Sequence, residues 1–266
     1  MSAVIKLSSA ATRGFWEIPV LFEDDHLLAL DKPAGLPVSP SREAPDPAQP
    51  NLVRLLHDAI AAGKPWVKER QLAYLSHVHR LDEETSGVLV LAKSKVMLVA
   101  LANFFGQEKP TLRYTALVHG IPAQDRFAVN ARLGPHPAKP GMSRVDPKGK
   151  RAETLFEVAE KFAAHTLLRC LPRTARPHQV RVHLQNTGLP IVGDLLYGGQ
   201  PLLLSRLKRA YRLKPGREER PLLTRVALHA EELTLPHPVT GETLTITAPW
   251  PKDLRVAVKY LREFAR

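Results

Sequence analysis

The sequence predicts an α+β fold, in which helices flank a mixed and mostly antiparallel β-sheet. Short alternating or β-branched runs recur along the chain, and runs with helical spacing lie between them. No repeat, low-complexity segment or long linker interrupts this pattern. The length of 266 residues suits one large domain or two small ones. We expect a disordered tail over residues 1–15 and one folded domain over residues 16–266.

Apolar spacing and turn residues locate the elements of the first half. The apolar run of residues 88–92 has the length and β-branched content of a buried strand, and Ser94 can cap the helix that follows. Five prolines make residues 37–50 a loop. Predicted strands cover residues 20–31, 88–92 and 112–118, and predicted helices cover residues 52–60 and 94–105.

The second half has more predicted strands than helices. Thr174 can cap a helix that runs to about Asn186, with Gly188 at its end position. A hairpin over residues 226–235 and 242–248 precedes a final amphipathic helix over residues 253–264. Further predicted strands cover residues 127–133, 152–159 and 165–171.

The charge of the chain indicates a polyanionic partner. Lysine and arginine outnumber the acids by 38 to 26, a formal net charge of +12. Residues 173–225 contain eleven Lys and Arg against three acids, and residues 139–151 contain five against one. Such clustering favours nucleic acid as the partner, although a basic surface can also serve solubility alone.

The composition also bears on the compartment. No stretch approaches the ~18 consecutive apolar residues of a membrane span, and the first sixteen residues lack the apolar region of a signal peptide. The single cysteine, Cys170, excludes an internal disulfide and fits a reducing compartment. Its place in an alternating run indicates a buried small side chain. We therefore expect a cytoplasmic protein.

A charged cluster, Arg80 to Glu84, leads directly into the predicted buried strand. Asp82 at such a junction can be partly desolvated, and a desolvated carboxylate needs a cation to stay ionised. Arg181 is a candidate partner, because it shares a face of the predicted helix with His178 and Gln185. A solvated helix face is the alternative interpretation.

Other patterns indicate no metal or nucleotide site. His77 and His79 alternate as zinc ligands can, but no third ligand follows at a recognisable spacing. The glycines at 193, 198 and 199 match neither phosphate-loop nor dinucleotide spacing. These residues alone define a basic α+β domain with a candidate acidic site.

Five segments, in order along residues 20–255, together resemble the RluA-type pseudouridine synthases. They are DDHLLALDKPAGLPV, HRLDEETSGVLVLAKS, RYTALVHG, RTARPHQVRVHLQNTGLPIVGDLLYG and LHAEELTLPHPVTGETLTITAPWP. The resemblance implies the pseudouridine synthase fold with a central RNA-binding cleft, and it makes residues 16–266 a catalytic domain. It implies isomerisation of uridine in rRNA or tRNA by base flipping, without a metal or an organic cofactor. Many relatives carry an N-terminal S4-type domain, which we do not expect here.

The resemblance also implies roles for individual residues. Asp82 is the expected catalytic aspartate, Tyr114 packs on the flipped base, and Arg181 forms a salt bridge with Asp82. Arg80 enters the RNA stack where the uridine leaves. The expected RNA-binding residues are Arg80, His79, Lys32, Arg173, Arg176 and His178. We expect a monomer that acts on a structured RNA such as a stem-loop.

Two departures from the family pattern concern the loop before the predicted helix. Ala175 stands where the family usually has Gly, which is tolerable unless the turn needs a positive φ. Pro177 stands where Thr is frequent, and proline suits a first helical turn.

Three functions remain open from the sequence. The first is the isomerase, with Asp82 acting either on C1′ of the sugar or by deprotonation through a glycal. The second is a non-catalytic RNA-binding factor for ribosome assembly, which an intact set of Asp82, Tyr114 and Arg181 disfavours. The third is a hydrolase that uses the carboxylates of residues 82–84, but adjacent residues cannot flank a scissile bond at the ~5–9 Å separation that glycosidases use.

Overall fold

The computed structural model describes residues 3–9, 11–40, 49–208, 210–213 and 216–265. The chain forms two compact units. The first comprises Met1–Leu112 and Ala230–Pro249, and the second comprises Arg113–His229 and Trp250–Arg266. The chain crosses between the units three times: inside β6, inside β12, and between Pro249 and Trp250.

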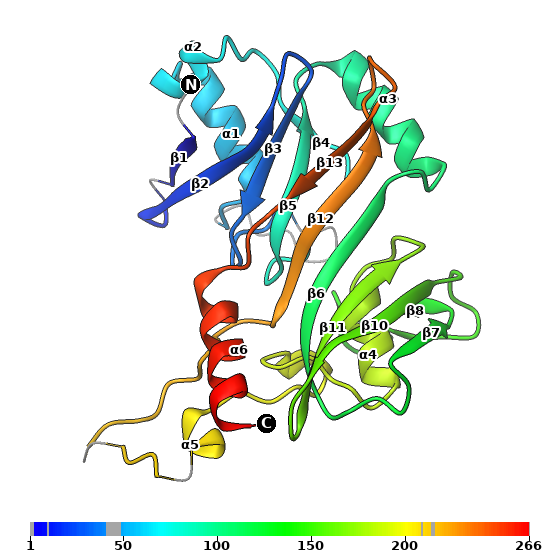
Figure 1. Cartoon of the computed structure of the whole chain (residues 1–266). Coiled ribbons are helices and arrows are strands. Elements are labelled where there is room, and N and C mark those ends of the chain that lie inside the picture. Colours follow the sequence, from blue (N-terminus) through cyan, green and yellow to red (C-terminus); the bar gives the residue numbers. More distant parts are fainter. Residues whose placement is uncertain (1–2, 10, 41–48, 209, 214–215, 266) are drawn as a thin grey trace. The chain divides into compact units, whose positions relative to one another are not determined.

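The sheet of the first unit follows the order β1-β2-β3-β5-β12 (Figure 1). Strand β13 pairs with β12, and the two-residue strand β4 pairs with β5. Strands β1, β2, β3 and β5 pair antiparallel along this order, and β4 and β13 are also antiparallel to their partners. The strands are β1 Val4–Ser9, β2 Gly14–Glu23, β3 Leu27–Lys32, β4 Ser76–His77, β5 Ser86–Ala92, β12 Leu228–Pro236 and β13 Thr243–Thr247.

Strand β1 corrects the prediction of a disordered tail over residues 1–15. Ile5 and Leu7 are buried, and they pair in register with Ile18 and Trp16 of β2. The alternating pattern of residues 4–9 is therefore that of an edge strand, which the sequence analysis did not recognise because the run is short. Residues 1–2 and 10 of the expected tail lie outside the described residues.

Strand β5 is buried along its whole length because both faces of the sheet are covered there. Leu89 and Leu91 belong to one apolar cluster together with residues of α1 and α2, whereas Val88 and Val90 belong to another that includes Leu101 of α3. Alternate side chains of one strand thus enter two cores, which explains the continuous apolar run in the sequence.

Side-chain caps start the two longer helices of the first unit, and the cap of α3 is the predicted Ser94. Helix α1 (Leu52–Ala61) begins after Asn51, whose side chain accepts a hydrogen bond from Arg54 N. Helix α3 (Lys95–Gly106) begins after Ser94, whose side chain accepts from Met97 N. A short helix, α2 (Pro65–Glu69), was not predicted. Residues 41–48 of the predicted loop lie outside the described residues.

The sheet of the second unit follows the order β6-β11-β10-β7, and its neighbouring strands are antiparallel. A separate hairpin, β8-β9, carries part of the basic segment 139–151. The strands are β6 Thr111–His119, β7 Arg126–Asn130, β8 Leu133–Pro135, β9 Ser143–Val145, β10 Glu153–Lys161 and β11 His165–Pro172.

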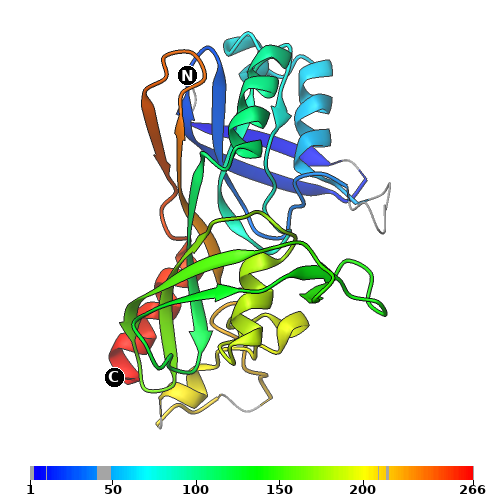
Figure 2. The same cartoon turned by 90° about the vertical axis from the view of Figure 1, so that its right-hand side faces the viewer.

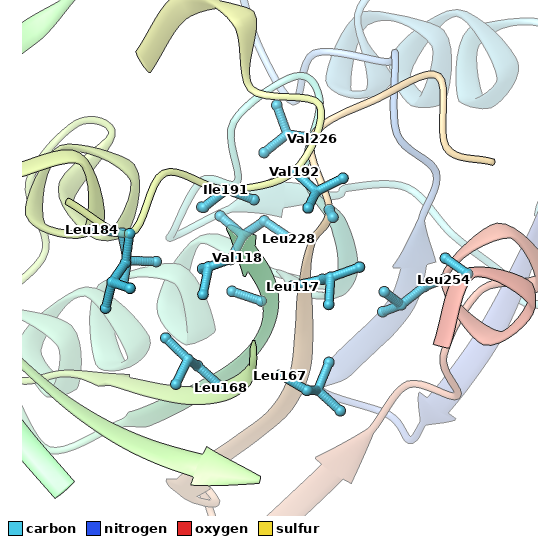
Figure 3. Close-up of a cluster of buried hydrophobic side chains, with 14 of the residues drawn as sticks. Leu117, Val118, Leu167, Leu168, Leu184, Ile191, Val192, Val226, Leu228 and Leu254 are labelled. Atoms are coloured by element: carbon cyan, nitrogen blue, oxygen red, sulfur yellow. The ribbon is translucent and has the colours of Figure 1, made fainter. Parts of the chain in front are cut away.

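Helices α4 and α6 contribute apolar side chains to the core of the second unit. Helix α4 lies against β9, β10 and β11 (Figure 2). Figure 3 shows Leu184 of α4 and Leu254 of α6 on opposite sides of Leu117 and Val118 in β6. The helical elements are α4 Gln179–Asn186, the 3₁₀ turn η1 Leu195–Tyr197, α5 Leu204–Leu207 and α6 Lys252–Phe264.

Cys170 lies in this core and is fully buried, as the sequence predicts. Burial raises the pKa of its thiol, so the thiolate is disfavoured. Within the described residues, no helix is long and apolar enough to cross a membrane.

Candidate active site

Asp82 occupies the first position of a tight turn that leads into β5. Thr85 N donates to the carbonyl oxygen of Asp82 at 3.1 Å, which closes the turn. The carbonyl oxygen of Glu83 accepts from Gly35 N at 2.8 Å. The Asp82 side chain is half-buried, and Arg80 is exposed. The backbone of the turn is thus anchored while the candidate carboxylate remains partly accessible.

Lys32 anchors this turn from inside the first unit. Its side chain is fully buried, and Nζ donates to the carbonyl oxygens of Pro33 and Leu36, each at 2.8 Å, and of Glu83 at 3.1 Å. A buried ammonium that is held by carbonyl dipoles cannot reach a phosphate. The prediction that Lys32 binds RNA is therefore corrected: the structure gives it the role of fixing the 82–85 turn.

The small residues Thr85, Ser86 and Gly87 follow the acids because the chain enters the core directly after the turn. Thr85 and Ser86 are buried, and Gly87 has φ of 118°. A Cβ at Gly87 would collide with the backbone carbonyl of Ala230 in β12. Glycine is required here both for the positive φ and for the close approach of two strands.

His79 is also a structural residue rather than an RNA contact. Its ring is buried, its Nε2 accepts a hydrogen bond from Val90 N at 3.0 Å, and it stacks on Phe105 with centroids 5.1 Å apart. Burial, with a smaller contribution from His77, lowers the pKa of His79 to about 3. The prediction that His79 binds RNA is therefore corrected, since a neutral, enclosed imidazole offers no charge to phosphate.

The lowered pKa of His79 predicts a loss of stability in mild acid. The unfolded chain binds a proton at this imidazole below its ordinary pKa of 6.5, whereas the native state does not until about pH 3. The free energy of unfolding should therefore fall as the pH decreases from about 6.5 toward 3, with a contribution from His79 of up to about 1.4 kcal/mol per pH unit. Urea unfolding at several pH values measures this slope.

The comparison variant for this slope is His79→Gln, which keeps an acceptor side chain without a titrating group. His165 and His183 also have lowered pKa values and will contribute in both proteins, so only the difference in slope reports on His79. Equal slopes in the two proteins would contradict the assignment of a buried neutral His79.

Activity should survive strong chelation. The Nε2 atom of His79 accepts from Val90 N, which leaves only its buried Nδ1 as a possible metal ligand. Among the described residues, no group of three or more His, Cys, Asp or Glu side chains is placed to hold a metal ion. We expect the turnover rate to be the same before and after dialysis against EDTA. Loss of turnover that one particular metal restores would contradict this expectation.

Glu83, the residue after Asp82, contacts Gln49 through its side chain and the anchor of the turn through its backbone. The Gln49 side chain donates a hydrogen bond from Nε2 to Oε2 of Glu83 at 3.3 Å. Partial burial and the neighbouring Glu84 raise the pKa of Glu83. The backbone carbonyl of Glu83, which accepts from Lys32 and Gly35, is the part of this residue that the turn uses.

Tyr114 lies in the middle of β6, in register with Cys170 of β11. Its side chain is half-buried and packs against the apolar core of the second unit. The ring is therefore supported from one side by the core, which suits a rigid stacking surface for a base.

Arg181 is buried, and a carboxylate that the sequence analysis missed holds it. Its Nε donates to Oδ2 of Asp194 and its Nη2 to Oδ1, each at 2.8 Å. Its guanidinium carbon lies 5.0 Å from the centroid of the Tyr197 ring. The alternative of a solvated helix face is therefore wrong. The expected pair with Asp82 joins residues of different units and stays a prediction.

The loop before α4 differs from the predicted helix start. Helix α4 begins at Gln179 rather than near Thr174, after His178 in the left-handed conformation with φ of 55°. The Thr174 hydroxyl accepts from Glu153 N at 3.0 Å and donates to Gln179 Oε1 at 2.9 Å. Thr174 thus ties the loop to β10 instead of capping a helix.

Gln179 fixes the same loop, which presents the predicted RNA-binding arginines. Its Oε1 accepts from Arg176 N, and its Nε2 donates to the carbonyl oxygen of Glu153 at 2.9 Å. Arg173 is exposed, whereas Arg176 is half-buried and donates through Nε to the carbonyl oxygen of Arg151. These hydrogen bonds fix the loop, and Arg173 faces solvent.

The departures from the family pattern fit this geometry. Ala175 has no positive φ, so glycine is not required at that position. Pro177 lies before the first residue of α4 and disturbs no helical hydrogen bond.

The predicted site residues therefore fall into two groups, one in each unit. In the first unit, Lys32 anchors the turn of Asp82, next to the exposed Arg80. In the second unit, His178 and Arg181 are brought together through Tyr197, whose hydroxyl shares a hydrogen bond of 2.7 Å with His178 Nδ1. The signal for Asp194 and Tyr197 was the Gly-Asp-Leu-Leu-Tyr-Gly sequence at the end of the fourth family-like segment, in which neither residue was assigned a role.

The fold, the turn of Asp82 and the buried Arg181 can now be compared with known proteins. The profile of a family described as RNA pseudouridylate synthase matches residues 26–186, more than half of the chain. The chain belongs to this RNA pseudouridylate synthase family and is an RNA pseudouridine synthase, an isomerase.

Relatives and solved structures agree with this membership. Ribosomal large subunit pseudouridine synthase D of Xanthomonas campestris pv. campestris is 37% identical over 249 residues, which cover 92% of this chain and 69% of the relative. Ribosomal large subunit pseudouridine synthase C of Vibrio vulnificus is 35% identical over 243 residues, covering 91% of this chain and 69% of the relative. The structure of human RNA Pseudouridylate Synthase Domain Containing 4 superimposes with a TM-score of 0.67 at 25% identity, covering 95% of this chain and 94% of that one.

Proposed function

We propose that this enzyme isomerises uridine in ribosomal RNA, at a structured site from which the base can be flipped. The names of the relatives carry this choice of RNA, since several are ribosomal large subunit pseudouridine synthases. The basic hairpin and loops of the second unit are consistent with such a polyanionic substrate. Transfer RNA is the competing substrate, and the substrate experiment below distinguishes the two.

The proposed reaction needs one glycosidic bond to break and another bond to form. The N1–C1′ bond breaks, the uracil turns, and C5 bonds to C1′. The proton on C5 is lost and N1 gains one, so atoms and electrons balance without a redox partner. Asp82 is the proposed catalytic carboxylate, either as the nucleophile at C1′ or as the base of a glycal route.

Base flipping explains the other proposed residues. Extruding a uridine costs about a few kcal/mol, and stacking on an aromatic ring such as Tyr114 returns about 1–3 kcal/mol. The exposed Arg80 can fill the vacated place in the RNA stack with a planar cation. Arg181, held by Asp194, is the proposed partner of Asp82.

Phosphate contacts are proposed for the exposed cations of the second unit. All five Lys and Arg of residues 139–151 are exposed. In the stretch 173–225, Arg181 and Arg225 are instead paired with Asp194 and Asp253, so they do not contribute free charge to this surface. Arg209 and Lys214 of that stretch lie outside the described residues. The exposed cations include Lys139, Arg144, Lys148, Lys150, Arg151, Arg173, Arg206, Lys208, Arg212, Arg217 and Arg220.

RNA binding should therefore depend strongly on salt. The logarithm of the affinity should fall with the logarithm of the salt concentration, at a slope of roughly 0.7 to 0.9 per phosphate neutralised. Lys148→Gln should weaken binding and reduce the slope by about one. Lys259→Gln, which removes the same charge from the exposed side of α6, is the matched control. Identical slopes for wild type and Lys148→Gln would remove Lys148 from the phosphate-binding surface.

The substrate itself is tested by mapping pseudouridine in total RNA from cells with and without the protein. We expect a position in ribosomal RNA to lose its pseudouridine, and we expect a short stem-loop of that sequence to react in vitro. An unstructured oligomer of the same sequence should react more slowly. Loss of modification only in tRNA would overturn the proposed substrate, and a requirement for full-length RNA would overturn the sufficiency of a stem-loop. The monomeric state and the cytoplasmic location stay predictions.

A further inference from the structure

We propose that Asp194 is the positioning residue for Arg181, and that Tyr197 fixes the plane of its guanidinium. This inference rests on the proposed role of Arg181 in the reaction. It adds two residues of the second unit, on the segment after α4, that sequence reasoning did not select.

The Asp194 carboxylate binds Arg181 in a way that fixes direction as well as charge. Two parallel hydrogen bonds of 2.8 Å join both carboxylate oxygens to Nε and Nη2. Both side chains are 1% exposed, so no solvent competes for these donors. A bidentate pair of this kind defines the plane and the rotation of the guanidinium, which a single contact would not do.

Tyr197 restricts the same guanidinium from its face. The ring centroid lies 5.0 Å from Cζ of Arg181, within the range of a cation–π contact. The hydroxyl of Tyr197 accepts from Ser143 N at 2.9 Å and is hydrogen-bonded to His178 Nδ1 at 2.7 Å. One buried tyrosine thus connects Arg181 with the residue before α4 and with the basic hairpin β8-β9.

The backbone of residues 193–199 is built to hold Asp194 and Tyr197 in place. A Cβ at Gly199 would collide with the carbonyl oxygen of Ile191, and one at Gly193 would collide with that of Arg225. Gly193 also has φ of 77°, in the left-handed region. The carbonyl oxygen of Asp194 accepts from Tyr197 N at 3.1 Å and from Gly199 N at 2.8 Å. The glycines therefore serve a tight turn around Asp194.

Stability alone does not account for this arrangement. A fully buried ion pair carries a desolvation penalty that its Coulombic attraction only offsets, and apolar side chains of similar volume often stabilise a core as well. The buried Asp194 charge is explained if its function is to orient Arg181. A guanidinium that acts on a catalytic carboxylate must be held within a fraction of an ångström of its working position.

The test compares Asp194→Asn with Asp253→Asn. Asp253 forms a less buried bidentate pair with Arg225 in the same unit, at 2.8 and 3.0 Å, so the second variant removes the same kind of contact from a different arginine. We expect Asp194→Asn to lower kcat by about 100-fold while RNA affinity is unchanged. Asp253→Asn should keep the wild-type kcat. Melting temperatures and RNA dissociation constants are measured for both variants.

A second background separates positioning from a general structural effect. In Arg181→Ala, the further change Asp194→Asn should cause no additional loss of kcat, because the residue through which Asp194 acts is already absent. Asp194→Glu keeps the charge but moves the carboxylate by one methylene, and it should also lower kcat. This variant replaces Asp194→Asn in the test if Asp194→Asn does not fold.

The outcomes separate this inference from the proposed function. If Arg181→Ala keeps wild-type turnover, the proposed role of Arg181 fails. If Arg181→Ala is inactive but folded Asp194→Asn and Asp194→Glu keep wild-type kcat, the positioning role of Asp194 is wrong. A further loss of kcat from Asp194→Asn in the Arg181→Ala background also overturns it, because Asp194 would then act independently of Arg181.

Discussion

Asp82→Ala and Asp82→Asn are expected to abolish isomerisation while the fold and RNA binding are largely retained. The carboxylate is the only group proposed to act on the glycosidic bond, so its removal leaves base flipping and phosphate contacts without chemistry. The turn that carries Asp82 is held through backbone atoms, by Thr85 N to the carbonyl of Asp82 and by Lys32 and Gly35 to that of Glu83. None of these contacts depends on the Asp82 side chain.

The measurement is pseudouridine formation in a stem-loop substrate, with RNA affinity and melting temperature as readouts of the fold. Glu83→Gln is the matched control, because it removes a neighbouring carboxylate from the same turn and leaves the backbone anchor in place. It should retain turnover. Pseudouridine formation by purified Asp82→Ala at a rate near that of wild type would show that the proposed mechanism is wrong.

Arg181→Ala should damage both stability and activity. The substitution strands the Asp194 carboxylate, which is 1% exposed, and removes both of its 2.8 Å hydrogen bonds to arginine. Breaking a buried pair from one side costs about 3–5 kcal/mol in the free energy of unfolding. Turnover should fall further than stability explains, since the proposed partner of Asp82 is lost as well.

Chemical unfolding and turnover at a temperature where the variant is folded measure these two effects separately. Arg225→Ala provides the contrast in stability, because its partner Asp253 is one-third exposed and can be solvated when the arginine is removed. The loss in Arg225→Ala should be the smaller one. An unchanged free energy of unfolding in Arg181→Ala, together with normal turnover, would reduce Arg181 to a residue without a role in either property.

Local sequence was sufficient for most elements of the fold. The continuous apolar run of β5, the helical spacing of α1, the Ser94 cap of α3 and the hairpin β12-β13 follow from patterns within a few residues. The start of α4 could not be predicted in this way. The Thr174 hydroxyl has two possible uses, and only the nearby strand β10 decides that it binds Glu153 N instead of capping the helix.

The sequence also sufficed for the family resemblance and for Asp82 as the candidate carboxylate, because these depend on residue types in a fixed order. It did not determine which basic residues meet RNA. Lys32 and His79 lie in family-like segments, as Arg80 does, but folding encloses both of them. An enclosed side chain makes its hydrogen bonds within the protein and not with RNA.

Only the tertiary structure decided the surroundings of Arg181. Asp194 is thirteen residues away along the chain, beyond the end of α4, so no helical spacing connects the two side chains. Their contact depends on a turn that Gly193 and Gly199 allow to fold closely against neighbouring backbone. A sequence motif gives the residues of a site in order along the chain. The partner of a buried charge depends instead on which groups lie within hydrogen-bonding distance after folding has excluded water.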